Sequence, residues 1–312
     1  PWFGVWTLAI SVGIWYNCTN QFIVQRCLGA RSEWDARMGV VFAGFMKIVL
    51  PLLVVIPGIV AFRLYPGLED PDQAFPTLVR NLVPLGLSGI VMAGLASGML
   101  SHISSVLNSC STVFTMDLYK PVLGRHRSER HLVLVGRLSA FVILVIATLL
   151  AIWFSRRNLG VFILLQDIGA WVSAPSAAVF LLGVLWNRTT AWAATFVLLF
   201  AFPYTALMQY YLSVYVHWLM PFRNFLNRTF LVWIVSMLLL VLLSLVTKPP
   251  DPEKIKGIIW SWRVARLPES ERARNRGLRN LFLWWCIFIG IMAVLYAYVI
   301  WFQFWGPGAA AP

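Results

Sequence analysis

Hydroxyl and amide side chains recur every three or four residues between Ser97 and Thr115. The row consists of Ser97, Ser101, Ser104, Ser105, Asn108, Ser111, Thr112 and Thr115. At about 100° per residue these side chains share one face of a helix whose opposite face is apolar. Polar groups within a bilayer cost free energy unless they face other helices or a water-filled cavity. Helix packing is the simplest explanation for any one of them, but so many on one face favour a path for a solute or an ion.

Two further apolar segments carry polar residues far from their ends. Lys47 lies nine residues after Met38, where its apolar run begins, so it is roughly 13 Å deep at 1.5 Å per residue. A lysine at that depth costs several kcal/mol unless it reaches water or a partner. Gln166 and Asp167 interrupt another apolar run. An ion pair of Lys47 with Asp167 would be structural, and a polyhydroxylated or anionic ligand held between Lys47 and Gln166 would be functional. Both are compatible, because lysine has three donors.

The first apolar segment contains a polar run from Trp15 to Gln21, with the sequence WYNCTNQ. A run of this polarity predicts a helix that unwinds at mid-depth and exposes backbone groups to a ligand. The alternative is a polar packing patch on a continuous helix.

Composition identifies the elements that position these residues. The chain is 60% apolar and 12% charged, with a mean hydropathy of +0.76, which excludes an ordinary soluble domain. A membrane-spanning helix needs about 20 apolar residues. We therefore predict an all-α polytopic membrane protein with eight spans, at 2–28, 38–62, 82–118, 132–154, 160–186, 190–214, 228–247 and 281–304. The chain begins at Pro1, and its first span is too long and too polar for a cleaved signal peptide, so we expect a piece of a larger membrane protein.

The net charge of +13 is distributed unevenly between the loops. When the spans are threaded alternately from outside, eighteen Lys and Arg residues lie on inner loops and six on outer loops. This asymmetry sets membrane orientation, with loop 248–280 in the cytoplasm, and argues against a nucleic-acid partner. The arginine-rich run 272–279 is either a solvated helix near the lipid or a contact for anionic headgroups. The four cysteines lie in or at the ends of spans and imply no disulfide framework.

Four segments carry a resemblance to a known family: WYNCTNQFIVQRCL at 15–28, FPTLV at 75–79, LNSCSTVFTMDLY at 107–119 and SAAVFLLGVLWNR at 176–188. In this order the chain resembles the sodium/solute symporters, and among them the sodium–glucose cotransporter branch. The resemblance implies a partial LeuT-type inverted-repeat transporter that works by alternating access. Residues 1–186 would be the second five-helix repeat, 187–247 two peripheral helices, 248–280 a basic cytoplasmic loop and 281–312 the last membrane helix and tail. The first repeat, which lines half of the substrate site, would be absent.

The resemblance also implies a substrate site. Tyr16 corresponds to the aromatic inner gate beneath the sugar, and Phe162 to an outer-gate aromatic. Lys47 and Gln166 correspond to residues that bond sugar hydroxyls. Asn17 departs from the pattern, because glucose carriers usually have an aromatic residue there.

The implied sodium site departs from the family as well. The family uses a backbone carbonyl at the position of Gly98 and hydroxyls at Ser101 and the next residue, which here is His102. Sodium is a hard cation that prefers oxygen ligands, by the logic that applies to calcium and magnesium. Ser104 and Ser105 match hydroxyls linked to a second ion site in some members. His102 could couple transport to protons, since its charge changes near neutral pH, or mark a weakened sodium site, or simply be a packing residue.

We therefore expect part of a secondary symporter in the cell membrane that needs no organic cofactor and carries a small polar solute, a sugar or polyol, with Na⁺ as the coupling ion and H⁺ as the alternative. A non-transporting solute sensor on the same scaffold and a non-functional truncated fragment are the other hypotheses. We do not expect an enzyme, because the four histidines lie at different depths: His102, His126, His131 and His217. The oligomeric state is left open.

Overall fold

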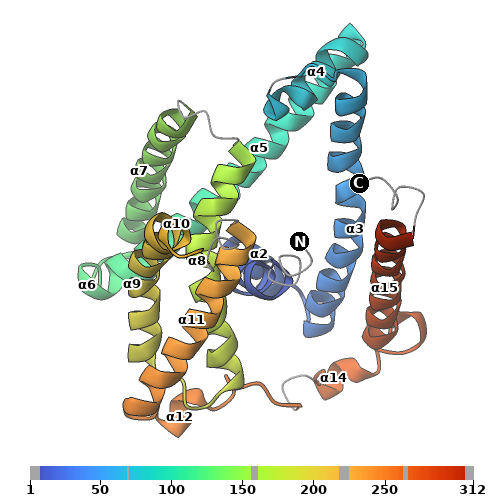
Figure 1. Cartoon of the computed structure of the whole chain (residues 1–312). Coiled ribbons are helices and arrows are strands. Elements are labelled where there is room, and N and C mark those ends of the chain that lie inside the picture. The colour runs from blue at the N-terminus through green and yellow to red at the C-terminus, as the bar shows by residue number, and fades with distance from the viewer. Residues whose placement is uncertain (1–7, 69, 156–160, 218–224, 263–265, 306–312) are drawn as a thin grey trace. The chain divides into compact units, whose positions relative to one another are not determined.

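A computed structural model describes residues 8–68, 70–155, 161–217, 225–262 and 266–305. Within these ranges the chain is helical and contains no strand (Figure 1). The chain divides into two compact units: unit 1 comprises residues 1–24 and 69–260, and unit 2 comprises 25–68 and 261–312. Each unit is described on its own.

Unit 1 holds most of the helices. They are the π-helical segments Leu8–Val12 (η1) and Trp15–Thr19 (η2), the start of α2 (Gln21–Leu28), the 3-10 turn Pro71–Gln73 (η3), α4 (Ala74–Leu82), α5 (Leu85–Val113), π-helical Phe114–Tyr119 (η4), α6 (Lys120–Val122), α7 (Glu129–Ser155), α8 (Val161–Leu185), α9 (Ala191–Leu207), π-helical Met208–Leu212 (η5), α10 (Ser213–Tyr215), α11 (Phe225–Val246) and α12 (Pro252–Ile255).

Unit 2 contains the rest of α2, α3 (Glu33–Leu64), α14 (Glu269–Arg272), the 3-10 turn Gly277–Arg279 (η7) and α15 (Leu281–Trp305). Helices α3 and α15 lie side by side (Figure 1). Phe45 of α3 meets Trp284 and Phe288 of α15 edge-on, with ring centroids 5.9 and 5.5 Å apart. A Cβ on Gly44 would lie 3.1 Å from the Phe288 ring, so the glycine permits this close approach.

The core of unit 1 is formed by α8, α9 and α11. Ala193, Val197 and Leu240 are fully buried there. Ala174 and Ala177 of α8 are also fully buried, and small side chains let membrane helices approach closely. This three-helix core is the support against which the first helical segments of the unit pack.

Six helices among the described residues are long and apolar enough to cross a membrane, which confirms the prediction of an all-α polytopic membrane protein. They are Glu33–Leu64, Leu85–Val122, Glu129–Ser155, Ile168–Leu185, Leu226–Val246 and Leu281–Trp301. The expected span 190–214 is represented by the shorter apolar helix Ala191–Leu207, which continues into the π-helical turn η5. The described part of the expected span 2–28 is divided among η1, η2 and α2.

The polar run in the first segment is interrupted at a single residue. Asn20 has φ −72° and ψ 113°, an extended conformation, between η2 and α2. Before it, the chain stays helical but in the wider π form. The Asn17 amide donates to the Gly13 carbonyl at 2.8 Å, and the Thr19 hydroxyl to the Trp15 carbonyl at 2.7 Å. Side chains thus satisfy carbonyls of the distorted turn. The predicted unwinding is confirmed at Asn20 and wrong for Trp15–Thr19.

Candidate functional site

The row of hydroxyls on α5 and η4 divides into an open part and a buried part. Ser97, Ser101 and Ser104 are exposed in unit 1. Ser111 and Thr115 are only 8% and 4% exposed, and their helical segments pack against α7. The explanation by helix packing therefore holds at the C-terminal end of the row, whereas the N-terminal part faces away from the unit's own helices.

Close approach to α7 explains the buried end. A Cβ built on Gly136 of α7 would lie 3.5 Å from the Thr115 hydroxyl oxygen. Ser139, one turn further along α7, is 9% exposed and donates to the Gly136 carbonyl at 2.9 Å. Small residues on both helices thus meet here, as at other packed membrane helices.

In the row, several hydroxyl protons are donated to carbonyls of the same helix. Ser104 and Ser105 both donate to the Ser101 carbonyl, at 3.0 and 2.9 Å. Thr112 donates to the Asn108 carbonyl at 2.7 Å. A hydroxyl that donates in this way keeps acceptor lone pairs on its oxygen. Such oxygens suit a hard cation that approaches from outside the helix.

The predicted ion-binding residues occupy two successive turns of α5. Gly98 and His102 line a shallow and mainly apolar hollow along the helix, and Ser101 lies outside this lining. A Cβ on Gly98 would meet nothing within 4 Å, so its backbone faces open space. Ser101, next to His102 in the chain, is exposed as well. Within the described residues no three His, Cys, Asp or Glu side chains gather to hold a metal ion, so oxygen ligands for a cation would come from hydroxyls and carbonyls.

An aromatic chain joins this helix to the predicted gate. The His102 ring meets Phe22 of α2 edge-on, with centroids 5.5 Å apart and planes at 88°. Phe22 in turn meets Tyr16 edge-on at 6.1 Å and 81°. The structure thus brings Tyr16 and His102 together through Phe22, which we did not predict as a site residue. Its position just after the break at Asn20 aims it back toward η2, and only that break could have indicated its role.

Gln166 belongs to the same unit as Tyr16, the predicted gate residue. It is half-buried on α8, the helix against which η2 packs. Asn17 of η2 is exposed. The side chains of Phe162 and Asp167 lie outside the described part of the structure.

Lys47 lies on an exposed face of α3 in unit 2. Gln166 and Tyr16 are in unit 1. The substrate pocket between Lys47 and Gln166 therefore stays a prediction.

Comparison with known proteins identifies a family. Residues 2–200 match the family described as the sodium:solute symporter family. A sodium/glucose cotransporter of Vibrio parahaemolyticus is 34% identical over 273 residues, which cover 82% of this chain and 47% of the relative. Sodium/myo-inositol cotransporter 2 of Oryctolagus cuniculus is 30% identical over 302 residues, covering 88% of this chain and 44% of the relative. The chain thus spans about half the length of these curated relatives.

Proposed function

Because the chain belongs to the sodium:solute symporter family, we propose that it takes part in sodium-coupled symport of a small polar solute. The family and the named relatives are transporters rather than enzymes, which sets aside the intramembrane enzyme. The six apolar helices and the family make the chain an integral multi-pass membrane protein.

One contact carries the proposal. Through Phe22, α5, which holds the predicted ion-binding residues, is joined to η2, which holds the predicted gate residue Tyr16. A cation held by the Gly98 carbonyl and the Ser101 hydroxyl would fix one position of this face of α5. A shift of α5 would move His102, which is next to Ser101. The ring contacts of His102 with Phe22 and of Phe22 with Tyr16 would then move Tyr16 as well. Cation binding would in this way favour one gate conformation, which is what coupling requires.

We propose a sugar or polyol as the solute. The relatives are named as cotransporters of glucose and of myo-inositol, which both present a ring of hydroxyls. Lys47 supplies donors, whereas the Gln166 amide supplies both donors and an acceptor. Asn17 would add a hydrogen-bonding amide where glucose carriers stack an aromatic ring, and Phe162 would close the site from the outer side.

Uptake into proteoliposomes tests this function, with protein expressed from its complete natural reading frame. Glucose and myo-inositol should each be tried under a sodium gradient and under a proton gradient. We expect uptake of at least one of them only with sodium, impaired by Lys47→Ala and by Gln166→Ala. An unchanged apparent affinity and rate in both variants would contradict the proposed pocket.

The coupling ion and the aromatic link need separate variants. Phe22→Ala should weaken the sodium dependence of uptake, while Phe200→Ala, which removes an aromatic stacked on Phe196 of α9, should not. Strict sodium dependence that survives His102→Ala would eliminate proton coupling. Uptake driven equally by a proton gradient, and abolished by His102→Ala, would replace sodium with the proton as the coupling ion.

A further inference from the structure

A hollow of about 520 Å³ in unit 2 combines arginines with apolar side chains. Arg37 and Val40 of α3 line one side of it, and Arg266 and Arg272 line another. Phe282 and Trp285, from the first turns of α15, complete the apolar part. Since α3 and α15 are both candidate spans that begin here, the hollow lies where two helices enter the membrane.

The frame around the hollow is held by bonds between distant parts of the chain. The Glu271 carboxylate accepts the backbone N–H groups of Glu33 and Trp34, at 3.3 and 2.6 Å. Arg274 pairs with Asp35 at 2.9 Å and lies 4.2 Å from the centroid of the Trp34 ring. Trp34, Leu267 and Leu281 form a small buried core beneath these bonds. The arginines of the hollow are therefore attached to a defined scaffold.

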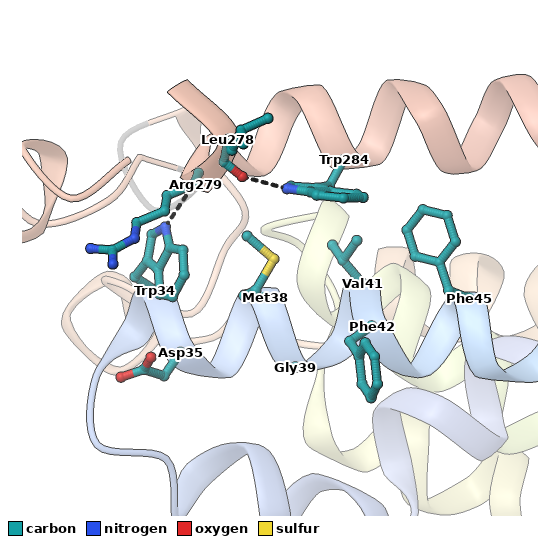
Figure 2. A pocket seen from close by; sticks show the side chains of 10 residues that line it. All are labelled: Trp34, Asp35, Met38, Gly39, Val41, Phe42, Phe45, Leu278, Arg279 and Trp284. Atoms are coloured by element: carbon teal, nitrogen blue, oxygen red, sulfur yellow. Dashed lines mark hydrogen bonds between the residues drawn. The ribbon is translucent and has the colours of Figure 1, made fainter. Parts of the chain in front are cut away.

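A second hollow of about 630 Å³, shown in Figure 2, lies on a different side of α3. Met38, Val41 and Phe45 lie there on the side of α3 that faces α15 (Figure 2). Its two indole N–H groups are already used, because Trp34 donates to the Arg279 carbonyl at 3.1 Å and Trp284 to the Leu278 carbonyl at 2.6 Å. This second hollow thus lacks the cluster of arginines that distinguishes the first.

Arg266 and Arg272 of the first hollow retain donors for an anion. Arg37 pairs with Glu33, and Arg272 pairs with Glu269 at 3.2 Å and donates to the Leu267 carbonyl. The Arg272 guanidinium has five N–H donors, so these bonds leave others available. Arg266 has no ion-pair partner among the residues that the structure describes.

Asn275 adds a neutral donor to the same wall. Its side-chain oxygen accepts the backbone N–H of Leu281 at 2.8 Å. The amide NH₂ is thereby oriented away from that bond, and it can donate to a ligand in the hollow.

We propose that this hollow binds the phosphate headgroup of an anionic phospholipid, with an acyl chain along Val40, Phe282 and Trp285. Arginine forks match phosphate oxygens, and basic clusters beside membrane helices attract anionic lipids. The apolar wall favours a lipid over a free phosphate ion: Val40 is 47% exposed, Phe282 74% and Trp285 43%. The leaflet is the one at which α3 and α15 begin, which the charge distribution predicts to be cytoplasmic.

Native mass spectrometry of the whole chain in a neutral detergent tests the site. Phosphatidylglycerol, phosphatidylcholine and inorganic phosphate are titrated separately. We expect one phosphatidylglycerol to bind more tightly than the remaining bound lipids and at least tenfold more tightly than phosphatidylcholine. Equal binding of the two lipids would overturn the proposal, and binding of inorganic phosphate as tight as that of phosphatidylglycerol would replace the lipid with a soluble anion.

Matched arginine variants locate the bound lipid. Arg266→Gln should weaken phosphatidylglycerol binding about fivefold, on the order of one basic side chain near a membrane surface. Arg266→Lys, which keeps the charge but loses the planar fork, should weaken binding less than Arg266→Gln does. Arg276→Gln removes an exposed arginine of the same loop that does not line the hollow, and it should change nothing. Equal losses in Arg266→Gln and Arg276→Gln would show a general charge effect and overturn the site.

Discussion

Polar side chains at the start of α3 and along α5 form hydrogen bonds in opposite ways. At α3 the bonds reach across the sequence: Trp34 and Glu271 are 237 residues apart, and Asp35 and Arg274 are 239 apart. Along α5 the hydroxyls of Ser104 and Thr112 donate to carbonyls three and four residues earlier in the same helix. The first group holds the fold together, whereas the second leaves a polar face available.

This difference separates polar groups that hold the fold together from polar groups that are available to a ligand. A side chain that bonds a distant segment contributes to stability through that contact, and its loss leaves a buried partner unsatisfied. A hydroxyl that bonds its own helix adds little stability, since it competes with the helical ladder. Exposed examples of the second kind, such as Ser104, therefore fit ligand binding better than folding.

A large loss of stability is expected when the Glu271 carboxylate is removed. Glu271→Ala removes the acceptor of two backbone N–H groups at the start of α3 and should cost about 2 kcal/mol. Glu269→Ala is the matched control, because the Glu269 side chain is 88% exposed and its one ion pair among the described residues of unit 2 is with Arg272, a surface pair worth less than about 1 kcal/mol. Unfolding in mixed detergent and SDS micelles measures both. An equal loss of stability in the two variants would mean that the bonds of Glu271 to the start of α3 stabilise the fold no more than the surface pair of Glu269 with Arg272.

Variants of two glycines, Gly136 and Gly98, test whether the hydroxyl row has a buried part and an open part. Gly136→Leu would press a side chain against Thr115, and overpacking of this kind costs about 1–3 kcal/mol. Gly98→Leu faces open space, so the same stability assay should show no loss. In uptake experiments Gly98→Leu should nevertheless raise the sodium concentration needed for half-maximal rate. A larger stability loss at Gly98 than at Gly136 would reverse the assignment of the open and buried parts.

A smaller effect is expected at the end of η4. The Tyr119 hydroxyl and Nε2 of His131 are hydrogen-bonded at 2.8 Å, which ties η4 to α7. Tyr119→Phe should cost about 1 kcal/mol, the net worth of one such bond. Tyr215→Phe, at a residue that is 80% exposed, is the control and should be neutral. No difference between the two in the SDS titration would mean that this cross-element bond does not stabilise the fold.

Periodicity and composition predicted the helical class and most of the spans, because both depend on residues close in sequence. They missed how Trp15–Thr19 avoids unwinding, since that depends on Asn17 and Thr19 bonding back to their own turn. They also treated the whole hydroxyl row as one surface. The partner that buries its end, Gly136, lies on another helix, and no pattern within α5 reveals it.

The candidate site was predicted less completely than the fold. The row pointed to a path for a solute or an ion, and the resemblance pointed to Ser101 and its neighbours as ion ligands and to Tyr16 as the gate. The edge contacts of Phe22 with Tyr16 and His102 require the chain to turn at Asn20. The polar run predicted a break in this segment, but neither its exact residue nor the ring contacts that it permits.

The central claim is that the exposed, N-terminal part of the hydroxyl row forms the path of the cation. The sodium dependence of uptake tests this claim most directly. Ser101→Ala and Ser111→Ala each delete one hydroxyl from the same row, the first exposed and the second 8% exposed. In proteoliposomes, with protein from the complete reading frame, Ser101→Ala should raise the half-maximal sodium concentration about tenfold, the equivalent of one lost ligand. Ser111→Ala should stay within about twofold of the original for the same amount of folded protein. Equal shifts, or a larger one in Ser111→Ala, would contradict the account.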